Sequence, residues 1–150
     1  MQTIASELQQ IIQKYLPPLQ SISEEDYALK SSPDKWSKKQ ILGHLVDSAQ
    51  NNIRRFICAV YEEQPKVVYN QEQWVEINHY QEYPVDDLIV LWQQLNKQIC
   101  FILSHASPEQ GRRICLTEAA HPLDWLASDY IKHLKHHLHQ VLELDAVSYP

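Results

Sequence analysis

Four histidines lie within seven residues in the last fifth of the chain, at positions His133, His136, His137 and His139. If residues 129–144 form a helix, its apolar positions recur at spacings of three and four, which is typical of a helix that buries one face. His133 and His137 fall within that apolar stripe, whereas the other two fall on the polar side. Side chains at i and i+4 of a helix lie about 5–6 Å apart. Two imidazoles at this spacing can therefore bind one metal ion at bonds of roughly 2.0–2.1 Å.

A third ligand would have to come from another helix, and residues 37–62 offer one. Ser37 is a good N-cap for this helix, whose inner stripe is unusually polar: Ile41, His44, Leu45, Ser48, Asn52, Arg55, Phe56 and Ala59. A buried polar group without a partner costs about 1–3 kcal/mol, so such a face is more typical of a cavity wall than of a dry core. His44 lies on this inner stripe, just as His133 and His137 lie on the inner stripe of the last helix. The second and fourth helices of a bundle can face each other, so His44 is the expected third ligand.

The rest of the chain predicts an all-α four-helix bundle that forms a single domain over residues 1–150. Apolar periodicity predicts helices over 3–16, 37–62, 85–104 and the last segment, and Pro17 and Pro18 are expected to end the first. The connections are 62–84, expected to be mostly irregular, and 106–123, which has some strand character. Only two glycines occur, and this scarcity argues against a Rossmann or P-loop fold.

Composition excludes several classes of partner. The net charge of −6 disfavours nucleic acid and anionic membranes as main partners. No apolar run approaches the ~20 residues of a membrane span, and the N-terminus lacks the pattern of a signal peptide. Cys58, Cys100 and Cys115 are scattered and odd in number, which is typical of reduced thiols in a cytoplasmic protein.

Three blocks of the sequence together resemble the DinB-like superfamily, and within it the branch of YfiT-type metal-dependent hydrolases. They are KWS at 35–37, GHLVDSAQNNIRRF at 43–56 and DYIKHLKHHLHQ at 129–140. The resemblance implies a four-helix bundle with a divalent metal on three histidines, which fall by position on His44, His133 and His137. It also implies a homodimer, and zinc or nickel as the metal. Ile53 departs from the family pattern, which favours a polar residue there, often histidine.

Three neutral imidazoles would leave such a metal its full charge and at least one open coordination position. Zinc, nickel, iron and cobalt all suit this donor set. Asp47, three residues after His44, and Asp129, four before His133, are candidates for orienting the ligands or relaying a proton. Either could equally be a plain surface carboxylate. Arg55 lies about 16 Å along the helix from His44, so it is expected to pair with Asn52 or a carboxylate rather than to reach the metal.

The predicted function is a divalent-metal-dependent enzyme, either hydrolase-like or a low-molecular-weight-thiol S-transferase, acting on a small molecule. A metal in this site would activate a water with a pKa near ~7, or bind a substrate thiolate. A second hypothesis is a non-catalytic helical module that binds a metal or a small molecule. A third is a structural dimer whose histidines are ordinary hydrogen-bonded core residues, since HxxxH also recurs by chance in helices.

Overall fold

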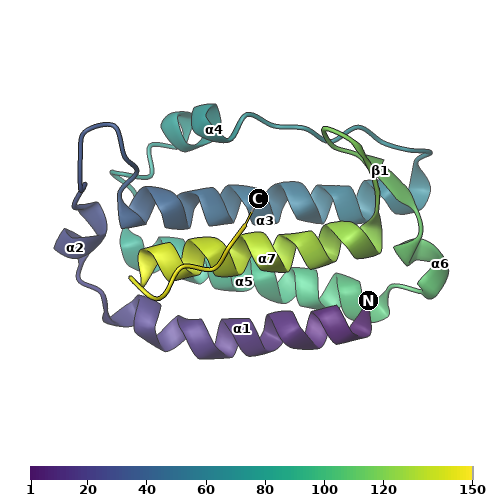
Figure 1. The fold of residues 1–150 in the computed structure, drawn as a ribbon, viewed down its shortest axis with the longest axis horizontal. Helices are drawn as coiled ribbons and strands as arrows, with labels where there is room; N and C mark the ends of the chain where they lie inside the picture. Colours follow the sequence, from purple (N-terminus) through teal and green to yellow (C-terminus); the bar gives the residue numbers. More distant parts are fainter. Residues whose placement is uncertain (150) are drawn as a thin grey trace.

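The computed structural model describes residues 1–149, and within them four long helices pack side by side (Figure 1). The second and third of them in chain order run in one direction, and the first and fourth run in the opposite direction (Figure 1). These are α1 (Gln2–Ser21), α3 (Lys38–Tyr61), α5 (Val85–His105) and α7 (Leu123–Val141). Helix α3 packs against both α5 and α7, and α1 packs against α5 and α7. The predicted all-α four-helix bundle is confirmed.

Shorter elements lie at the ends and along one side of this bundle (Figure 1). They are α2 (Glu24–Ala28), α4 (Gln71–Ile77), α6 (Pro108–Gly111), β1 (Ile114–Leu116) and β2 (Ala120–Pro122). The two strands form an antiparallel hairpin, and Leu116 also bridges Lys66 in the preceding connection. The hairpin and residues 66–72 therefore form a wall beside α3 and α7, which matters for the cavity described below.

Helix α3 begins where its sequence predicts. The Ser37 hydroxyl accepts a hydrogen bond from the Gln40 amide and the Gln40 side chain accepts one from the Ser37 amide, which completes a capping box. Arg55 donates from Nη1 to Asn52 Oδ1 at 3.3 Å, so the expected pairing of these two residues is confirmed.

One expectation about the elements is wrong. Helix α1 continues through Pro17 and Pro18 to Ser21. Proline removes the hydrogen bonds that the carbonyls of residues 13 and 14 would accept, but both residues are exposed and water can replace those bonds. Burial of the Leu19 side chain stabilises the extra turn. The Leu19 carbonyl also accepts a hydrogen bond from Tyr27 Oη at 2.9 Å.

The connection between α3 and α5 is mostly irregular, as predicted. It contains the seven-residue helix α4, capped by the Asn70 side chain. After α4, the buried Tyr80 ring covers Gly43 on α3 so closely that a Cβ at position 43 would overlap it. This contact explains why α3 has a glycine one residue before His44.

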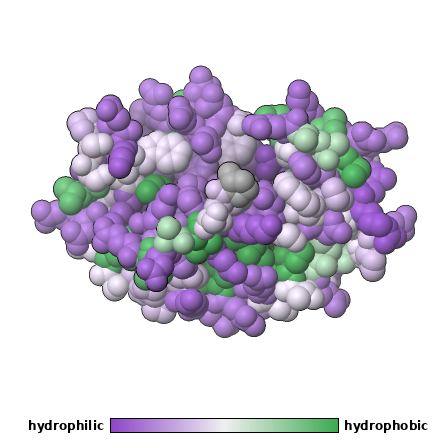
Figure 2. Space-filling model, viewed as in Figure 1, coloured by the Kyte–Doolittle hydropathy of each residue, from purple (hydrophilic) through white to green (hydrophobic). Residues whose placement is uncertain are grey.

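The core of the bundle is apolar and lies between the four long helices. Its largest fully buried side chains include Trp92, Phe56, Leu45 and Leu88. Hydrophilic residues cover most of the face shown in Figure 2, with the apolar ones interspersed among them. None of the helices within residues 1–149 combines the length and apolar character that crossing a membrane requires.

Candidate metal centre

Three histidines from two helices meet inside the bundle. His44 lies on α3, and His133 and His137 lie one turn apart on α7. Each offers a ring nitrogen that lies within 4.8 Å of the other two. The ring centroids are 4.9 Å apart for His44 and His133, 4.8 Å for His44 and His137, and 4.5 Å for His133 and His137. The structure thus brings together the three imidazoles that the helical phase selects.

The spacing of the ring nitrogens fits a shared metal ion. Two ligands bound at roughly 2.0–2.1 Å are about 2.9–3.4 Å apart in octahedral or tetrahedral geometry. The Nε2 atoms of His44 and His133 are 3.0 Å apart, which falls within this range. The same distance also suits an N–H···N hydrogen bond between the two rings. The donor set therefore fits a metal.

All three imidazoles are neutral at ordinary pH. Burial, with a smaller contribution from His137, lowers the pKa of His44 to about 3. Burial and the neighbouring histidines lower the pKa of His133 to about 2, and burial also lowers the pKa of His137. A neutral imidazole keeps a lone pair on one ring nitrogen, which a metal ligand requires.

Contacts outside the cluster fix which nitrogen of His137 carries its proton. His136 Nδ1 lies 2.7 Å from the Val147 carbonyl, which can only accept, so this nitrogen carries the proton and Nε2 accepts. The Gln140 side chain donates from Nε2 to His136 Nε2 at 2.9 Å. Its carbonyl oxygen therefore faces His137 Nδ1, at 2.8 Å, and accepts the hydrogen bond. The lone pair of His137 is left on Nε2.

Neither sequence motif nor spacing singled out Gln140 or the role of His136. The only signal available was that Gln140 follows His137 by three residues and His136 by four, on the same helix. For the other two imidazoles the outer contacts are weaker. Ser48 Oγ lies 3.5 Å from His133 Nδ1, and His44 Nδ1 is buried without a hydrogen-bond partner among the described residues.

The predicted carboxylate Asp47 is fully buried on α3 and has partners other than the imidazoles. Its Oδ1 accepts hydrogen bonds from Tyr80 Oη at 2.5 Å and from Asn78 Nδ2 at 3.1 Å. Its Oδ2 has no partner among the described residues. Burial raises the pKa of Asp47 to about 6, although the hydrogen bond from Tyr80 opposes that rise. Asp47 thus joins α3 to the segment that follows α4.

The other predicted carboxylate, Asp129, lies on α7 and is half-buried. Its Oδ2 accepts a hydrogen bond from Tyr149 Oη at 3.0 Å. The Tyr149 ring is 5.3 Å from the His133 ring, because residues 143–149 turn back along α7 (Figure 1). Asp129 and Tyr149 are thus neighbours of His133, and no sequence signal indicated that the tail would return to it.

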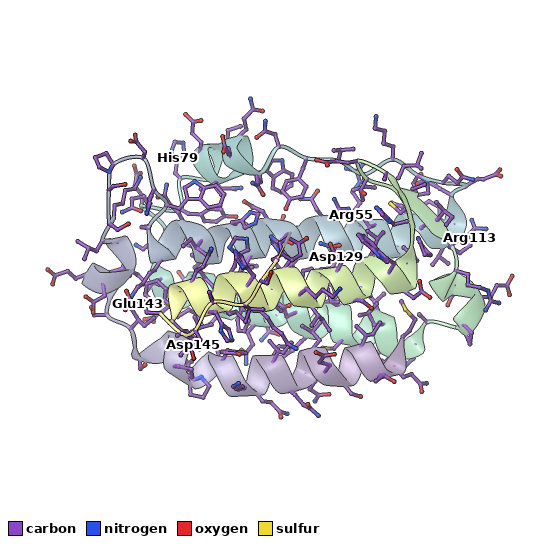
Figure 3. The ribbon with its side chains drawn as sticks, viewed as in Figure 1. Arg55, His79, Arg113, Asp129, Glu143 and Asp145 are labelled. Atoms are coloured by element: carbon purple, nitrogen blue, oxygen red, sulfur yellow. The ribbon has the colours of Figure 1, made fainter. Side chains whose placement is uncertain are left out.

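A cavity of about 1010 Å³ opens beside the histidine cluster. It lies between α3, α7, residues 68–72 and the hairpin, and His133 forms part of its wall. Figure 3 shows Arg55 and Asp129 projecting from α3 and α7 in the region of this cavity. Its other polar lining residues are Ser48, Asn52, Tyr69, Asn70, Gln71, Glu72, Thr117, Glu118, His121, Tyr130 and Tyr149. The cavity is large enough for a small organic molecule.

The family of this chain follows from its sequence as well as its fold. Residues 7–141 match the family described as the DinB superfamily. Because the match covers most of the chain, the protein belongs to the DinB superfamily.

Two proteins similar to this chain carry names that refer to a metal. A protein of Oceanobacillus iheyensis is 30% identical over 116 residues, which cover 73% of this chain and 64% of the relative. A protein of Bacillus mycoides is 28% identical over 112 residues, covering 67% of this chain and 64% of the relative. Both are named "Putative metal-dependent hydrolase". The matched region thus spans 64% of the length of these relatives.

Two solved structures share the fold. YfiT from Bacillus subtilis, described as "a probable metal-dependent hydrolase with an unusual four-helix bundle topology", superposes with a TM-score of 0.81 at 20% identity, over 93% of this chain and 84% of YfiT. A mycothiol-dependent maleylpyruvate isomerase superposes with a TM-score of 0.70 at 14% identity, over 98% of this chain and 60% of the isomerase. At these identities the likeness establishes the fold.

Proposed function

We propose that the protein is a divalent-metal-dependent enzyme that acts on a small molecule, either as a hydrolase or as a low-molecular-weight-thiol S-transferase. The observation that carries this proposal is the convergence of three neutral imidazoles, one of which, His133, lines a large cavity. His44, His133 and His137 would hold the metal. Zinc or nickel suits three nitrogen donors, with iron or cobalt as alternatives.

A bound divalent ion would lower the pKa of a coordinated water or thiol and so supply a nucleophile at neutral pH. The chain's own residues act around it. Gln140 and His136 keep the lone pair of His137 directed at the site. Tyr149 and Asp129, hydrogen-bonded to each other beside His133, are the polar groups placed to orient a reactant or carry its proton.

The thiol part of the proposal draws support from the mycothiol-dependent isomerase of the same fold. In a thiol S-transfer the thiolate sulfur attacks an electrophilic carbon, a C–S bond forms, the leaving group departs with its bonding electrons, and the thiol proton passes to solvent. The cavity has room for both partners at once. A homodimer and a cytoplasmic location also belong to this proposal.

A second candidate function is a module that binds a metal or small molecule without turnover. What favours it is that both predicted carboxylates have other partners. Asp47 is held by Tyr80 and Asn78, and Asp129 is held by Tyr149. No carboxylate within residues 1–149 forms a hydrogen bond to any of the three imidazoles, so a general base beside the site is not obvious.

Turnover of monochlorobimane separates these functions. The metal-loaded protein is mixed with monochlorobimane and a panel of thiols, and the fluorescence of the thiol adduct is followed as sulfur displaces chloride. A parallel arm follows hydrolysis of 4-nitrophenyl acetate without thiol. We expect a metal-dependent rate in one arm that His137→Ala abolishes, while the exposed His105→Ala variant keeps it. A protein that binds metal but shows no such rate in either arm would be the binding module.

A further inference from the structure

Arg55 is a cation held in a fixed position on the wall of the cavity. Its Nε donates to the Val67 carbonyl at 3.3 Å and its Nη1 donates to Asn52 Oδ1 at 3.3 Å. Asn52 is itself oriented, because its Nδ2 donates to the Ser48 carbonyl at 2.9 Å. These two anchors leave the Nη2 end of the guanidinium without a protein acceptor among the described residues. An arginine tethered in this way is preorganised to bind a planar anion.

The positive charge of Arg55 is not neutralised by an ion pair within residues 1–149. The Asp129 carboxylate shares the cavity, but it accepts its hydrogen bond from Tyr149. Glu72 and Glu118 also line the cavity, yet both are exposed at its rim and remain solvated. Burial lowers the pKa of Arg55, which reflects the cost of holding this charge away from water. A ligand anion would offset that cost.

A continuous line of polar groups connects this guanidinium with the histidine cluster. His133 Nδ1 lies 3.5 Å from Ser48 Oγ, Ser48 Oγ lies 3.4 Å from Asn52 Nδ2, and Asn52 Oδ1 accepts from Arg55. Ser48 and Arg55 are seven residues apart on α3, which is about 10 Å along the helix axis. A molecule of modest length can therefore reach from the cluster to Arg55 within the same cavity.

We propose that Arg55 binds a carboxylate of the substrate, at the far end of the cavity from the three histidines. The substrate is then a carboxylate-bearing molecule whose reacting group lies at the histidine cluster, about three helical turns from Arg55 when measured along α3 from His44. This inference rests on the proposed metal-dependent function, because the histidine cluster is where the other end of the molecule reacts. Arg55 acts in binding and specificity, not in the chemical step.

Two thiols of matched length test the proposal on the cobalt-loaded protein. Mercaptohexanoate carries a carboxylate at the end opposite the thiol, and mercaptohexanol carries a neutral hydroxyl there. Their affinities are measured from the thiolate-to-cobalt charge-transfer absorption. We expect the affinity for mercaptohexanoate to be at least about tenfold higher than that for mercaptohexanol, because an Arg–carboxylate contact is charge-assisted. Arg55→Gln should abolish this preference, and Arg54→Gln, which changes an exposed arginine of the same helix, should preserve it.

The comparison of the two thiols on the unaltered protein decides the matter even if Arg55→Gln folds poorly. Equal affinities, failure of both thiols to bind, or a preference that persists in a folded Arg55→Gln variant would overturn the assignment of Arg55. Cobalt bound with no carboxylate preference leaves the proposed function standing and rejects only this inference. If cobalt does not bind, or binds equally well after His137→Ala, the proposed function is rejected and this inference with it.

Discussion

At the scale of single residues, the direction of the His137 lone pair is decided outside the histidine cluster. The Val147 carbonyl fixes the tautomer of His136, which fixes the orientation of Gln140, which in turn places the proton of His137 on Nδ1. His136 and Gln140 thus position the His137 imidazole without being part of the histidine cluster. The helical phase of the sequence selected the three inward histidines, but it could not reveal this relay, since the Val147 carbonyl comes from a tail whose path has no periodic signal.

Removing the Gln140 side chain tests this relay. Gln140→Ala keeps a good helix former at an exposed position, so the fold should persist. His137 then loses the acceptor that holds its ring, and metal affinity should fall about 10- to 100-fold. The measurement is a competition titration with a chromophoric zinc chelator. Lys132→Ala, at an exposed position of the same helix, is the matched control, and equal affinities in the two variants would contradict the relay.

At the scale of the elements, regular periodicity made the long helices predictable, whereas the contacts of the connections were not. The apolar spacing, together with Ser37 as the expected N-cap, located the start of α3 closely. Pro17 and Pro18 did not end α1 as predicted, because the carbonyls that lose a hydrogen bond to them belong to exposed residues near the end of the helix. Helix α4, only seven residues long, is too short for a periodic pattern. Tyr80, in the segment after α4, reaches Asp47 because its ring packs against Gly43. No local sequence pattern predicts this contact.

The Asp47 contact predicts a pH dependence of stability. The folded state raises the pKa of Asp47 from 3.8 to about 6. Between these values the folded protein holds a proton that the unfolded chain has released, so this carboxyl makes the free energy of unfolding fall as pH rises, by at most about 1.4 kcal/mol per pH unit. Asp47→Asn keeps an acceptor for Tyr80 and cannot titrate. The free energy of unfolding of Asp47→Asn, relative to that of the unaltered protein, should therefore rise with pH between about 4 and 6 and become constant above that range.

Urea unfolding of both proteins across this pH range measures the effect. The three clustered histidines are present in both proteins and affect the pH dependence in the opposite direction, so their contribution cancels in the difference. Parallel stability profiles would show that the Asp47 pKa is ordinary. The same variant also examines the predicted catalytic role, because a proton relay through Asp47 requires that turnover fall sharply in Asp47→Asn, whereas a purely structural contact leaves turnover intact.

At the scale of the whole molecule, the proposed site joins α3 to α7, and residues of both helices also line the cavity. A metal bound there stabilises the folded bundle, since its ligands are assembled only when both helices are in place. The sequence supplied the fold class and the histidine set through helical phase and family resemblance. It could not supply the cavity, because that depends on how the hairpin, residues 68–72 and the tail close around the helices.

Metal content is the most direct test of this account. The protein is purified without a histidine tag and without added chelator, and its metal is quantified by elemental analysis next to the His133→Ala and His137→Ala variants. The account predicts about one divalent ion per chain in the unaltered protein, little or none in the variants, and unchanged helical circular dichroism in all three. Metal absent from the unaltered protein after incubation with zinc or nickel, or equally abundant in the folded variants, would contradict it.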